Sequence, residues 1–275
     1  MPTQSLFQPL KLGRYTLAHR IVMAPLTRMR ATPGTNAPNA LNAEYYGQRA
    51  TKGGLIICEA SPVVASGTAG PNVPGIYSEA QVAGWRLVTD AIHARGGVAF
   101  LQLWHGGRIS HSSLQLDGGL PQAPSAIPPS SGMVMGADFK PHPFETPRAL
   151  DTSELPGIVA AYGQAARNAV AAGFDGIEIH GANGYLLEQF LQSRTNKRTD
   201  AYGGSIENRA RLMLEATKAA ADAIGADRVG VRLSPYGRAN DSGEDDPMPL
   251  YGYVIGELNK MGLAYLHLIE PRASG

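Results

Sequence analysis

One short stretch of the chain collects three side chains that suit proton transfer to a carbonyl compound. An apolar run, Ile177 to Ile179, predicts a buried strand that ends at His180 and leads into a glycine-flanked turn with Asn183 and Tyr185. The imidazole and the carboxamide can donate hydrogen bonds to one oxygen, and the phenol can deliver a proton. This set suits a reaction that builds negative charge on a carbonyl oxygen and then protonates a carbon. The alternative is a capped helix start beside a structural core histidine.

The composition is that of an ordinary globular protein. The 275 residues include 24 Lys and Arg against 23 Asp and Glu, for a formal net charge of +1. This balance predicts no nucleic-acid partner and no anionic membrane surface, and no apolar stretch is long enough for a membrane span. Met1 to Lys11 lacks a signal-peptide pattern, so we expect a cytoplasmic protein. The single cysteine, Cys58, argues against a disulfide and a cysteine-ligated iron–sulfur cluster.

Short apolar runs alternate with helical patterns along the chain. Strands buried on both faces are expected at Ile21 to Ala24, Leu55 to Glu59, Val98 to Leu103, Ile177 to His180, Val229 to Leu233 and Tyr265 to Ile269. Helices are expected from Ser78 to Gly96, from Ser153 to Ala172, from Ser205 to Gly225 and from Leu250 to Met261. Alternation of strand and helix predicts a parallel sheet and an α/β fold.

Two parallel architectures compete for this pattern. A doubly wound nucleotide-binding sheet needs Gly-x-Gly-x-x-Gly after an early strand, and no such match follows any expected strand. A (β/α) barrel places its chemistry at the C-terminal ends of several strands. The polar and small candidates follow the strands in that way, at Pro25, Thr27, Glu59, Ala60, Gln102, Trp104, His180, Asn183, Tyr185, Arg232 and Ser234. The sequence therefore predicts a TIM barrel.

Two regions outside this alternation have expected places in a barrel. Residues 1 to 19 precede the first strand and are expected to form a hairpin that closes the barrel floor. Residues 105 to 150 are rich in proline, glycine and serine and show no sustained helical pattern. An irregular excursion at the catalytic end usually shapes a pocket. The alternative, a mobile surface loop, applies best to Gly132 to His142.

Ten segments in one order carry a family resemblance over essentially the whole chain. They are 19–28 (HRIVMAPLTR), 43–50 (AEYYGQRA), 74–78 (PGIYS), 102–108 (QLWHGGR), 123–126 (APSA), 180–185 (HGANGY), 190–196 (FLQSRTN), 198–205 (RTDAYGGS), 207–209 (ENR) and 231–235 (VRLSP). With these segments the chain resembles the Old Yellow Enzyme family of FMN-dependent ene-reductases. The resemblance implies a (β/α)8 barrel, an FMN cofactor, and NADPH or NADH as reductant.

The resemblance implies a flavin site formed by Ala24, Pro25, Leu26, Thr27, Ala60, Gln102, His180 and Arg232. The Thr27 hydroxyl would lie near the ring oxygen next to N5, or else only cap its loop. Gln102 would match the pyrimidine edge. Arg232 would stabilise negative charge on the reduced ring, and its alternative role is an ion pair with Glu178 or Glu59.

The resemblance also implies the substrate site. His180 and Asn183 would hold the carbonyl oxygen of an α,β-unsaturated compound, and Tyr185 would protonate its α-carbon after hydride reaches the β-carbon. Trp104 would form a pocket wall. Gly70 stands where the family usually has an aromatic residue, which predicts a roomier pocket. A metal site at His180 is disfavoured, because no carboxylate or second histidine has suitable spacing nearby.

The end of the chain departs from the family. We expect one barrel domain over residues 1–275 with six βα units, whereas a closed barrel needs eight, and the FMN phosphate would lie after strands seven and eight. Three explanations stay open: further residues beyond Gly275, a split protein completed by a C-terminal fragment on another chain, and a truncated product. A homo-oligomer is also considered. Larger iron–sulfur relatives fit poorly with one cysteine, and the non-enzyme alternative is a partial barrel that binds flavin or ligand without turnover.

Overall fold

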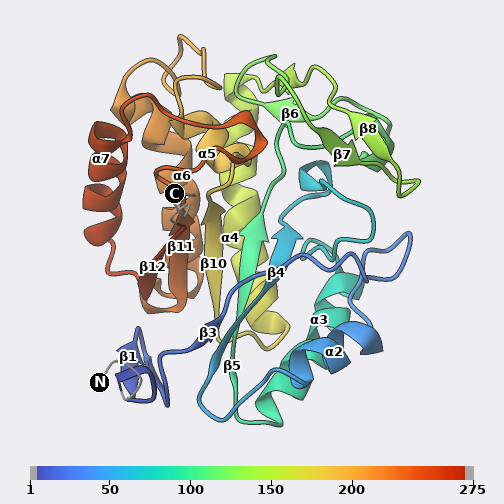
Figure 1. Ribbon diagram of the computed structural model, residues 1–275, viewed down its shortest axis with the longest axis vertical. Coiled ribbons are helices and arrows are strands. Elements are labelled where there is room, and N and C mark those ends of the chain that lie inside the picture. The colour runs from blue at the N-terminus through green and yellow to red at the C-terminus, as the bar shows by residue number, and fades with distance from the viewer. Residues whose placement is uncertain (1–4, 270–275) are drawn as a thin grey trace, which may run out of the picture.

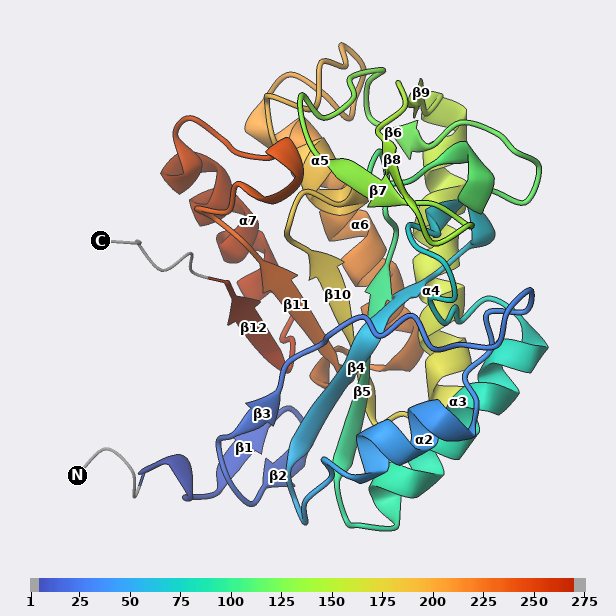
Figure 2. The ribbon, with the colours of Figure 1, turned by 45° about the vertical axis from the view of Figure 1, so that its right-hand side comes forward.

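The structure is a computed structural model and describes residues 5–269. Its centre is a parallel sheet with the strand order β12–β11–β10–β5–β4–β3 (Figure 1). The six strands are β3 (Val22–Met23), β4 (Leu55–Pro62), β5 (Val98–Trp104), β10 (Gly176–Gly181), β11 (Val229–Leu233) and β12 (Tyr265–Leu268). Each strand pairs with the next strand of this sheet along the chain, and the sheet curls as a barrel wall does (Figure 2). The fold is thus six βα units of a (β/α)8 barrel, as the sequence predicts.

The inner strands are buried on both faces and the two edge strands are not. β4 and β10 are buried over their whole length, because helices cover one face and the barrel interior covers the other. The prediction of burial on both faces is wrong at the edges, where Val22 is 39% exposed and Leu268 is 46% exposed. The reason is topological, since β3 and β12 each have a neighbouring strand on one side only.

The predicted helices form a layer outside the sheet (Figure 2). They are α3 (Glu79–His93), α4 (Leu155–Ala171), α6 (Ile206–Ile224) and α7 (Pro247–Asn259). The predicted caps are confirmed: Ser78 Oγ accepts from Gln81 N, and the Gln81 side chain accepts from Ser78 N, which completes a capping box. Ser205 caps α6 in the same way, and Gly225 ends it with a φ of 94°.

Two helices of the structure were not predicted from the sequence. α2 (Ala40–Gly47) is two turns long and begins at an Asn39 capping box. α5 (Leu186–Leu191) has six residues, and every one of them is buried. A helix that is buried all round has no polar face, so the helical period of its apolar residues disappears. α5 follows directly on the turn that carries Asn183 and Tyr185, and its packing therefore fixes where that turn lies.

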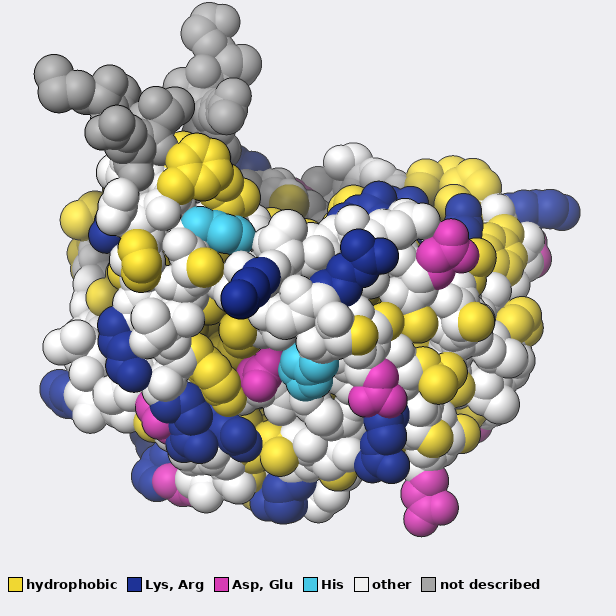
Figure 3. All heavy atoms as spheres, turned by 90° about the horizontal axis from the view of Figure 1, so that it is seen from below, with side chains coloured by type: hydrophobic (Ala, Val, Ile, Leu, Met, Phe, Trp, Pro, Cys, Tyr) yellow, Lys and Arg dark blue, Asp and Glu magenta, His cyan; other side chains and the backbone are white. Residues whose placement is uncertain are grey.

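A hairpin lies under the barrel, as expected. β1 (Leu10–Leu12) pairs antiparallel with β2 (Tyr15–Leu17). Leu12 and Leu17 pack with Leu55, Ile57 and Phe100, which come from the lower parts of β4 and β5. Seen from below, this end of the molecule shows apolar side chains interspersed with charges of both signs (Figure 3).

The excursion at residues 105–150 covers the opposite end, at the C-terminal ends of the strands (Figure 1). It holds two small sheets, one of β6 (Gln122–Ala123) with β9 (Arg148–Ala149) and one of β7 (Met133–Met135) with β8 (Pro141–Pro143). Residues 132–142 are therefore mostly a β-hairpin rather than an irregular loop. The buried Arg108 guanidinium donates to the carbonyls of Ile127 and Asp241, at 3.0 Å and 2.9 Å. It ties the excursion to the loop that follows β11.

The side of the sheet between β3 and β12 carries an apolar hollow. It is lined by Leu12, Val22, Ala24, Leu55, Ile57, Tyr265, Leu266, His267 and Leu268. Both strands bring their unpaired edges to this side. Within residues 5–269, no helix has the length and apolar character that crossing a membrane requires.

Candidate active site

The strand ends bring the predicted polar residues together in layers. His180, Arg232 and His267 lie in register across β10, β11 and β12. Gln102 pairs with Glu178 one layer deeper, across β5 and β10. Because alternate residues of a strand face the same side, these side chains all point into the barrel interior. The prediction had named His180, Arg232 and Gln102, and the structure adds Glu178 and His267.

His180 is held as a neutral imidazole with a defined tautomer. It is 4% exposed, and burial lowers the pKa of its imidazole to about 3, with a smaller lowering from the neighbouring Arg232 and His267. Its Nδ1 lies 3.4 Å from the backbone N of Ala182, from which it accepts. The proton of the neutral ring therefore belongs on Nε2, which is free to donate to a ligand oxygen.

Asn183 adopts an unusual backbone conformation that is held from both sides. Its φ is 59°, in the left-handed region, and Gly184 follows with a φ of 75°. Its N–H donates to Ser234 Oγ at 2.8 Å, and its carbonyl accepts from Asn240 Nδ2 at 2.8 Å. Both bonds use its backbone, so the side-chain amide stays available for a ligand. Asn240, on the loop after β11, is a contact that sequence reasoning missed.

Tyr185 stands between two aromatic rings at the start of α5. Its ring meets His180 at 5.0 Å and Trp104 at 4.9 Å, both edge-on. Burial raises the pKa of the Tyr185 phenol, and Asn240 and Arg232 oppose that shift in part. The phenol therefore carries its proton at neutral pH and can give it away. Tyr185 is the N-cap residue of α5, and its side chain makes no capping hydrogen bond. The start of this helix is instead held by Glu188 Oε2, which accepts from the Gly184 N–H.

Gln102 is oriented by a buried carboxylate. Its Nε2 donates to Glu178 Oε1 at 2.8 Å, while Glu178 Oε2 is contacted by Tyr265 Oη at 3.1 Å and His267 Nδ1 at 2.9 Å. The donor side of the amide is thereby occupied, and Gln102 Oε1 is left as an acceptor. Sequence reasoning could have found this network only by knowing the register of β12 with β10 across β11.

Arg232 does not form the ion pair that was its alternative role. Glu178 pairs with His267, and Glu59 accepts from Tyr46 Oη at 3.2 Å and from the backbone N of Arg28 at 2.8 Å. Among residues 5–269, no carboxylate lies within ion-pair distance of Arg232, and its buried Nε has no hydrogen-bond partner. Arg232 is half-buried, and leaving its buried Nε without a partner costs free energy. This arrangement suits an anionic or strongly polar ligand at the strand ends.

The segment after β3 lies open beside these groups. Ala24 and Leu26 are exposed, while Pro25 and Thr27 are half-buried. Its course is fixed by Glu59, whose carboxylate accepts from the Arg28 backbone N–H and which directly precedes the buried Ala60. The eight residues predicted for the flavin site thus come from five strands and their loops. Seven belong to β3, β4, β5 and β11, and the eighth, His180, belongs to β10.

Trp104 and Gly70 belong to one small apolar cluster. Trp104, Ala60 and Val73 form its core, with Met29 packed against it. A Cβ at Gly70 would lie 3.2 Å from both the Met29 and Val73 side chains. The Met29 and Val73 side chains therefore already occupy the space that a side chain at Gly70 would need, and the roomier pocket stays a prediction.

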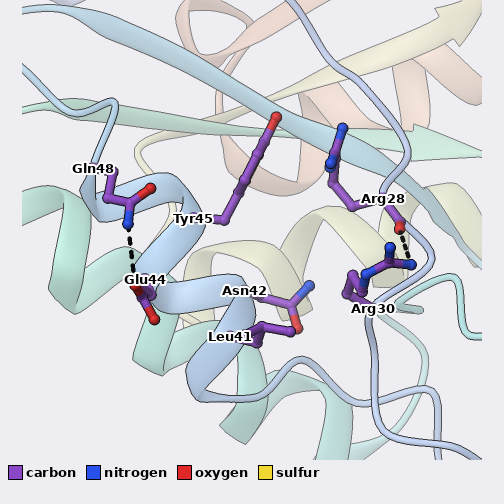
Figure 4. A pocket seen from close by; sticks show the side chains of 7 residues that line it. All are labelled: Arg28, Arg30, Leu41, Asn42, Glu44, Tyr45 and Gln48. Carbon is purple, nitrogen blue, oxygen red and sulfur yellow. Dashed lines mark hydrogen bonds between the residues drawn. The ribbon is translucent and has the colours of Figure 1, made fainter.

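A separate hollow lies between α2 and the segment after β3 (Figure 4). It is lined by Arg28, Arg30, Leu41, Asn42, Glu44, Tyr45 and Gln48, and none of the predicted site residues is among them. The Arg28 guanidinium stacks 4.8 Å from the Tyr45 ring centroid, and Arg49 covers the same ring at 3.7 Å. The ring and its two cations therefore stiffen the outer side of this segment.

The two buried carboxyls Glu59 and Glu188 give a prediction about stability and pH. Burial raises the pKa of each to about 7, from an ordinary 4.5. The unfolded chain loses these protons near pH 4.5 and the folded chain near pH 7. Their stabilising contribution is therefore complete below pH 4.5 and is lost as the pH rises to about 7.

Glu59→Gln and Glu188→Gln should each flatten this fall in the free energy of unfolding, by at most about 3 kcal/mol. Urea unfolding between pH 4.5 and 7.5 measures the slope. A slope that stays the same in both variants would contradict the raised pKa values.

Known proteins match this chain in sequence and in fold. The profile of the NADH:flavin oxidoreductase / NADH oxidase family matches residues 5–275. Flavin oxidoreductase hxnT of Emericella nidulans is 47% identical over 98% of this chain and 71% of its own length. 12-Oxophytodienoate reductase 7 of Oryza sativa subsp. japonica is 48% identical over 97% of this chain and 69% of its own length. The structure of morphinone reductase superposes with a TM-score of 0.94, at 48% identity, over 98% of this chain and 73% of that one.

Proposed function

Because the chain belongs to the NADH:flavin oxidoreductase / NADH oxidase family, we propose that it is an FMN-dependent ene-reductase. It is an oxidoreductase that acts on activated C=C bonds. The proposed substrates are α,β-unsaturated carbonyl or nitro compounds, and the proposed reductant is NADPH or NADH. The observation that carries the proposal is the convergence of His180, Asn183 and Tyr185 at the end of β10, beside an unpaired Arg232.

The residues at the strand ends fit the ring of FMN. Gln102 Oε1 is left as an acceptor and would take the pyrimidine N–H. Arg232 lacks an anion within the described chain and would face the ring edge where negative charge collects. Thr27 would donate to the ring oxygen next to N5, with Ala24, Pro25, Leu26 and Ala60 against the ring. Bound FMN would supply the hydride that the β-carbon of the substrate receives.

The residues of the β10 turn would act on the substrate. His180 Nε2–H and the Asn183 side-chain amide would donate to one carbonyl oxygen and stabilise the charge that develops there. The Tyr185 phenol, protonated at neutral pH because burial raises its pKa, would protonate the α-carbon. The Trp104 wall, with the Met29 and Val73 side chains that lie against Gly70, would decide which substituents fit.

The reductant is proposed only as a nicotinamide. Morphinone reductase, which is 48% identical to this chain, has been solved in complex with tetrahydroNAD. This supports binding of a nicotinamide ring at the same strand ends.

The open side of the sheet bears on how FMN is retained. We propose that a further polypeptide segment covers the apolar hollow between β3 and β12. The same segment would hold the FMN phosphate. The exposed Leu266 and Leu268 and the two unpaired strand edges support this proposal. Two alternatives remain: half of a split enzyme, and a partial barrel that binds flavin or ligand without turnover.

Anaerobic turnover with 2-cyclohexenone tests the proposed function. We expect one cyclohexanone formed for each NADPH or NADH consumed, with product measured by gas chromatography. Nicotinamide oxidation that needs oxygen and forms no cyclohexanone would show an oxidase and would contradict the ene-reductase assignment.

A further inference from the structure

A buried carboxylate lies under the turn that carries Asn183 and Tyr185. Glu188, on α5, is fully buried and receives three hydrogen bonds from three parts of the chain. Its Oε2 accepts from the Gly184 N–H at 2.5 Å, and its Oε1 accepts from the hydroxyls of Ser234 and Tyr251, each at 2.6 Å. Ser234 in turn accepts from the Asn183 N–H at 2.8 Å. Two consecutive backbone amides of the turn are thus bound to one carboxylate, directly or through one hydroxyl.

A simple helix cap would need less than this. One bond from the Glu188 carboxylate to an N–H at the start of α5 satisfies a cap. Here Ser234 comes from the end of β11 and Tyr251 from α7, so the carboxylate also joins the turn to both the strand end and the helix of the next βα unit. Within residues 5–269 no Lys, Arg or His is paired with Glu188. A buried carboxylate without a cation costs stability, and such groups persist where they hold a particular geometry.

The donors also dictate the chemistry of position 188. The Gly184 N–H can only donate. The Ser234 hydroxyl accepts from Asn183, and the Tyr251 hydroxyl accepts from Gln192 Nε2 at 3.4 Å, so both have a proton to give to Glu188. Above about pH 7, where Glu188 is ionised, its carboxylate accepts all three hydrogen bonds, whereas an amide presents its NH2 to at least one of the donors. The comparison with glutamine is therefore made at about pH 8.5. Glutamine therefore keeps the shape of Glu188 and loses its function as an acceptor.

We propose that Glu188, acting through Ser234, is the positioning residue that holds Asn183 at the angle needed to share one oxygen with His180. Asn183 has a left-handed φ, a conformation that an L-residue adopts at a cost unless its surroundings impose it. His180 needs no such support, because β10 fixes its backbone and Ala182 its ring. The role in substrate binding rests on the proposed function, and the role in ordering the turn does not.

Glu188→Gln and Ser234→Ala test the proposal by two routes. Both should weaken binding of 4-hydroxybenzaldehyde by about tenfold, which corresponds to one lost buried hydrogen bond. The phenol oxygen of this ligand would accept from His180 and Asn183. Both variants should speed amide hydrogen exchange at Asn183 and Gly184 by a similar factor.

Glu244→Gln is the matched control. Glu244 is also a largely buried carboxylate between α5 and α7, but it binds Ser193 and Arg209 and makes no contact with the turn. It should lower stability without changing phenol affinity or exchange at residues 183 and 184.

The proposal is overturned if Glu188→Gln and Ser234→Ala leave exchange at these two amides unchanged, or if Glu244→Gln loosens them equally. A third outcome separates the two proposals. If the unmutated protein binds no phenol but the variants still exchange these two amides faster, the proposed function is contradicted and the positioning role of Glu188 is supported.

Discussion

Tyr185→Phe is expected to slow reoxidation of the reduced flavin by 2-cyclohexenone by about 100- to 10,000-fold, the usual worth of a positioned general acid. The variant keeps the ring that packs edge-on between His180 and Trp104 and removes only the hydroxyl. The fold of the site should therefore persist, and the α-carbon would have to take its proton from water. Reduction of the flavin by NADPH or NADH needs no proton from Tyr185 and should change by no more than about twofold.

Stopped-flow absorbance measures the two half-reactions separately. Tyr162→Phe is the control, because the Tyr162 hydroxyl is buried on α4 without a partner in the described chain and lies outside the proposed site. It should leave both rates unchanged. If Tyr185→Phe slowed both half-reactions equally, Tyr185 would not be the proton donor.

The double variant His180→Ala, Asn183→Ala is expected to weaken binding of 4-hydroxybenzaldehyde by about 100-fold or more. Each buried hydrogen bond to a charged oxygen is worth about 1.5–3 kcal/mol, and two are lost. The two single variants complete a double-mutant cycle, and we expect coupling because both donors serve one oxygen.

The measurement is a spectral titration of the flavin with the phenol, in the wild type and all three variants. If the phenol affinity were the same in all four proteins, His180 and Asn183 would not be the donors to the ligand oxygen. Additive losses would mean that His180 and Asn183 do not share one ligand atom.

The sequence predicts the strands well in the middle of the sheet, where each strand has a neighbour on both sides. Val229–Leu233 agrees residue for residue with β11, and the caps at Ser78 and Ser205 are as expected. These features are local, since an apolar run of strand length or a serine three residues before an amide donor carries its own signal. Burial at β3 and β12 was wrong because it depends on which strands lie beside them, which no local pattern contains.

The candidate site also has a part that local sequence patterns predict and a part that they do not. His180, Asn183, Tyr185, Gln102 and Arg232 could be named because each follows a predicted strand, and the structure brings them together.

The contacts that support these residues could not be predicted, even where the sequence pointed to the residue, as at Ser234 and Glu178. Ser234 and Tyr251 lie 46 and 63 residues from Glu188, and His267 lies 89 residues from Glu178. Such contacts follow from strand register and helix packing, and single-sequence patterns do not report them.

The visible absorption spectrum of the purified protein, taken with its intact mass, tests the central claim most directly. We expect flavin absorption that bleaches with NADPH or NADH under anaerobic conditions and returns on addition of 2-cyclohexenone. The mass identifies which polypeptide carries the flavin, and so whether the 275 residues hold it alone. A protein that stays colourless after incubation with excess FMN, at the mass of this chain and with a folded circular dichroism spectrum, would contradict a flavin site at these strand ends.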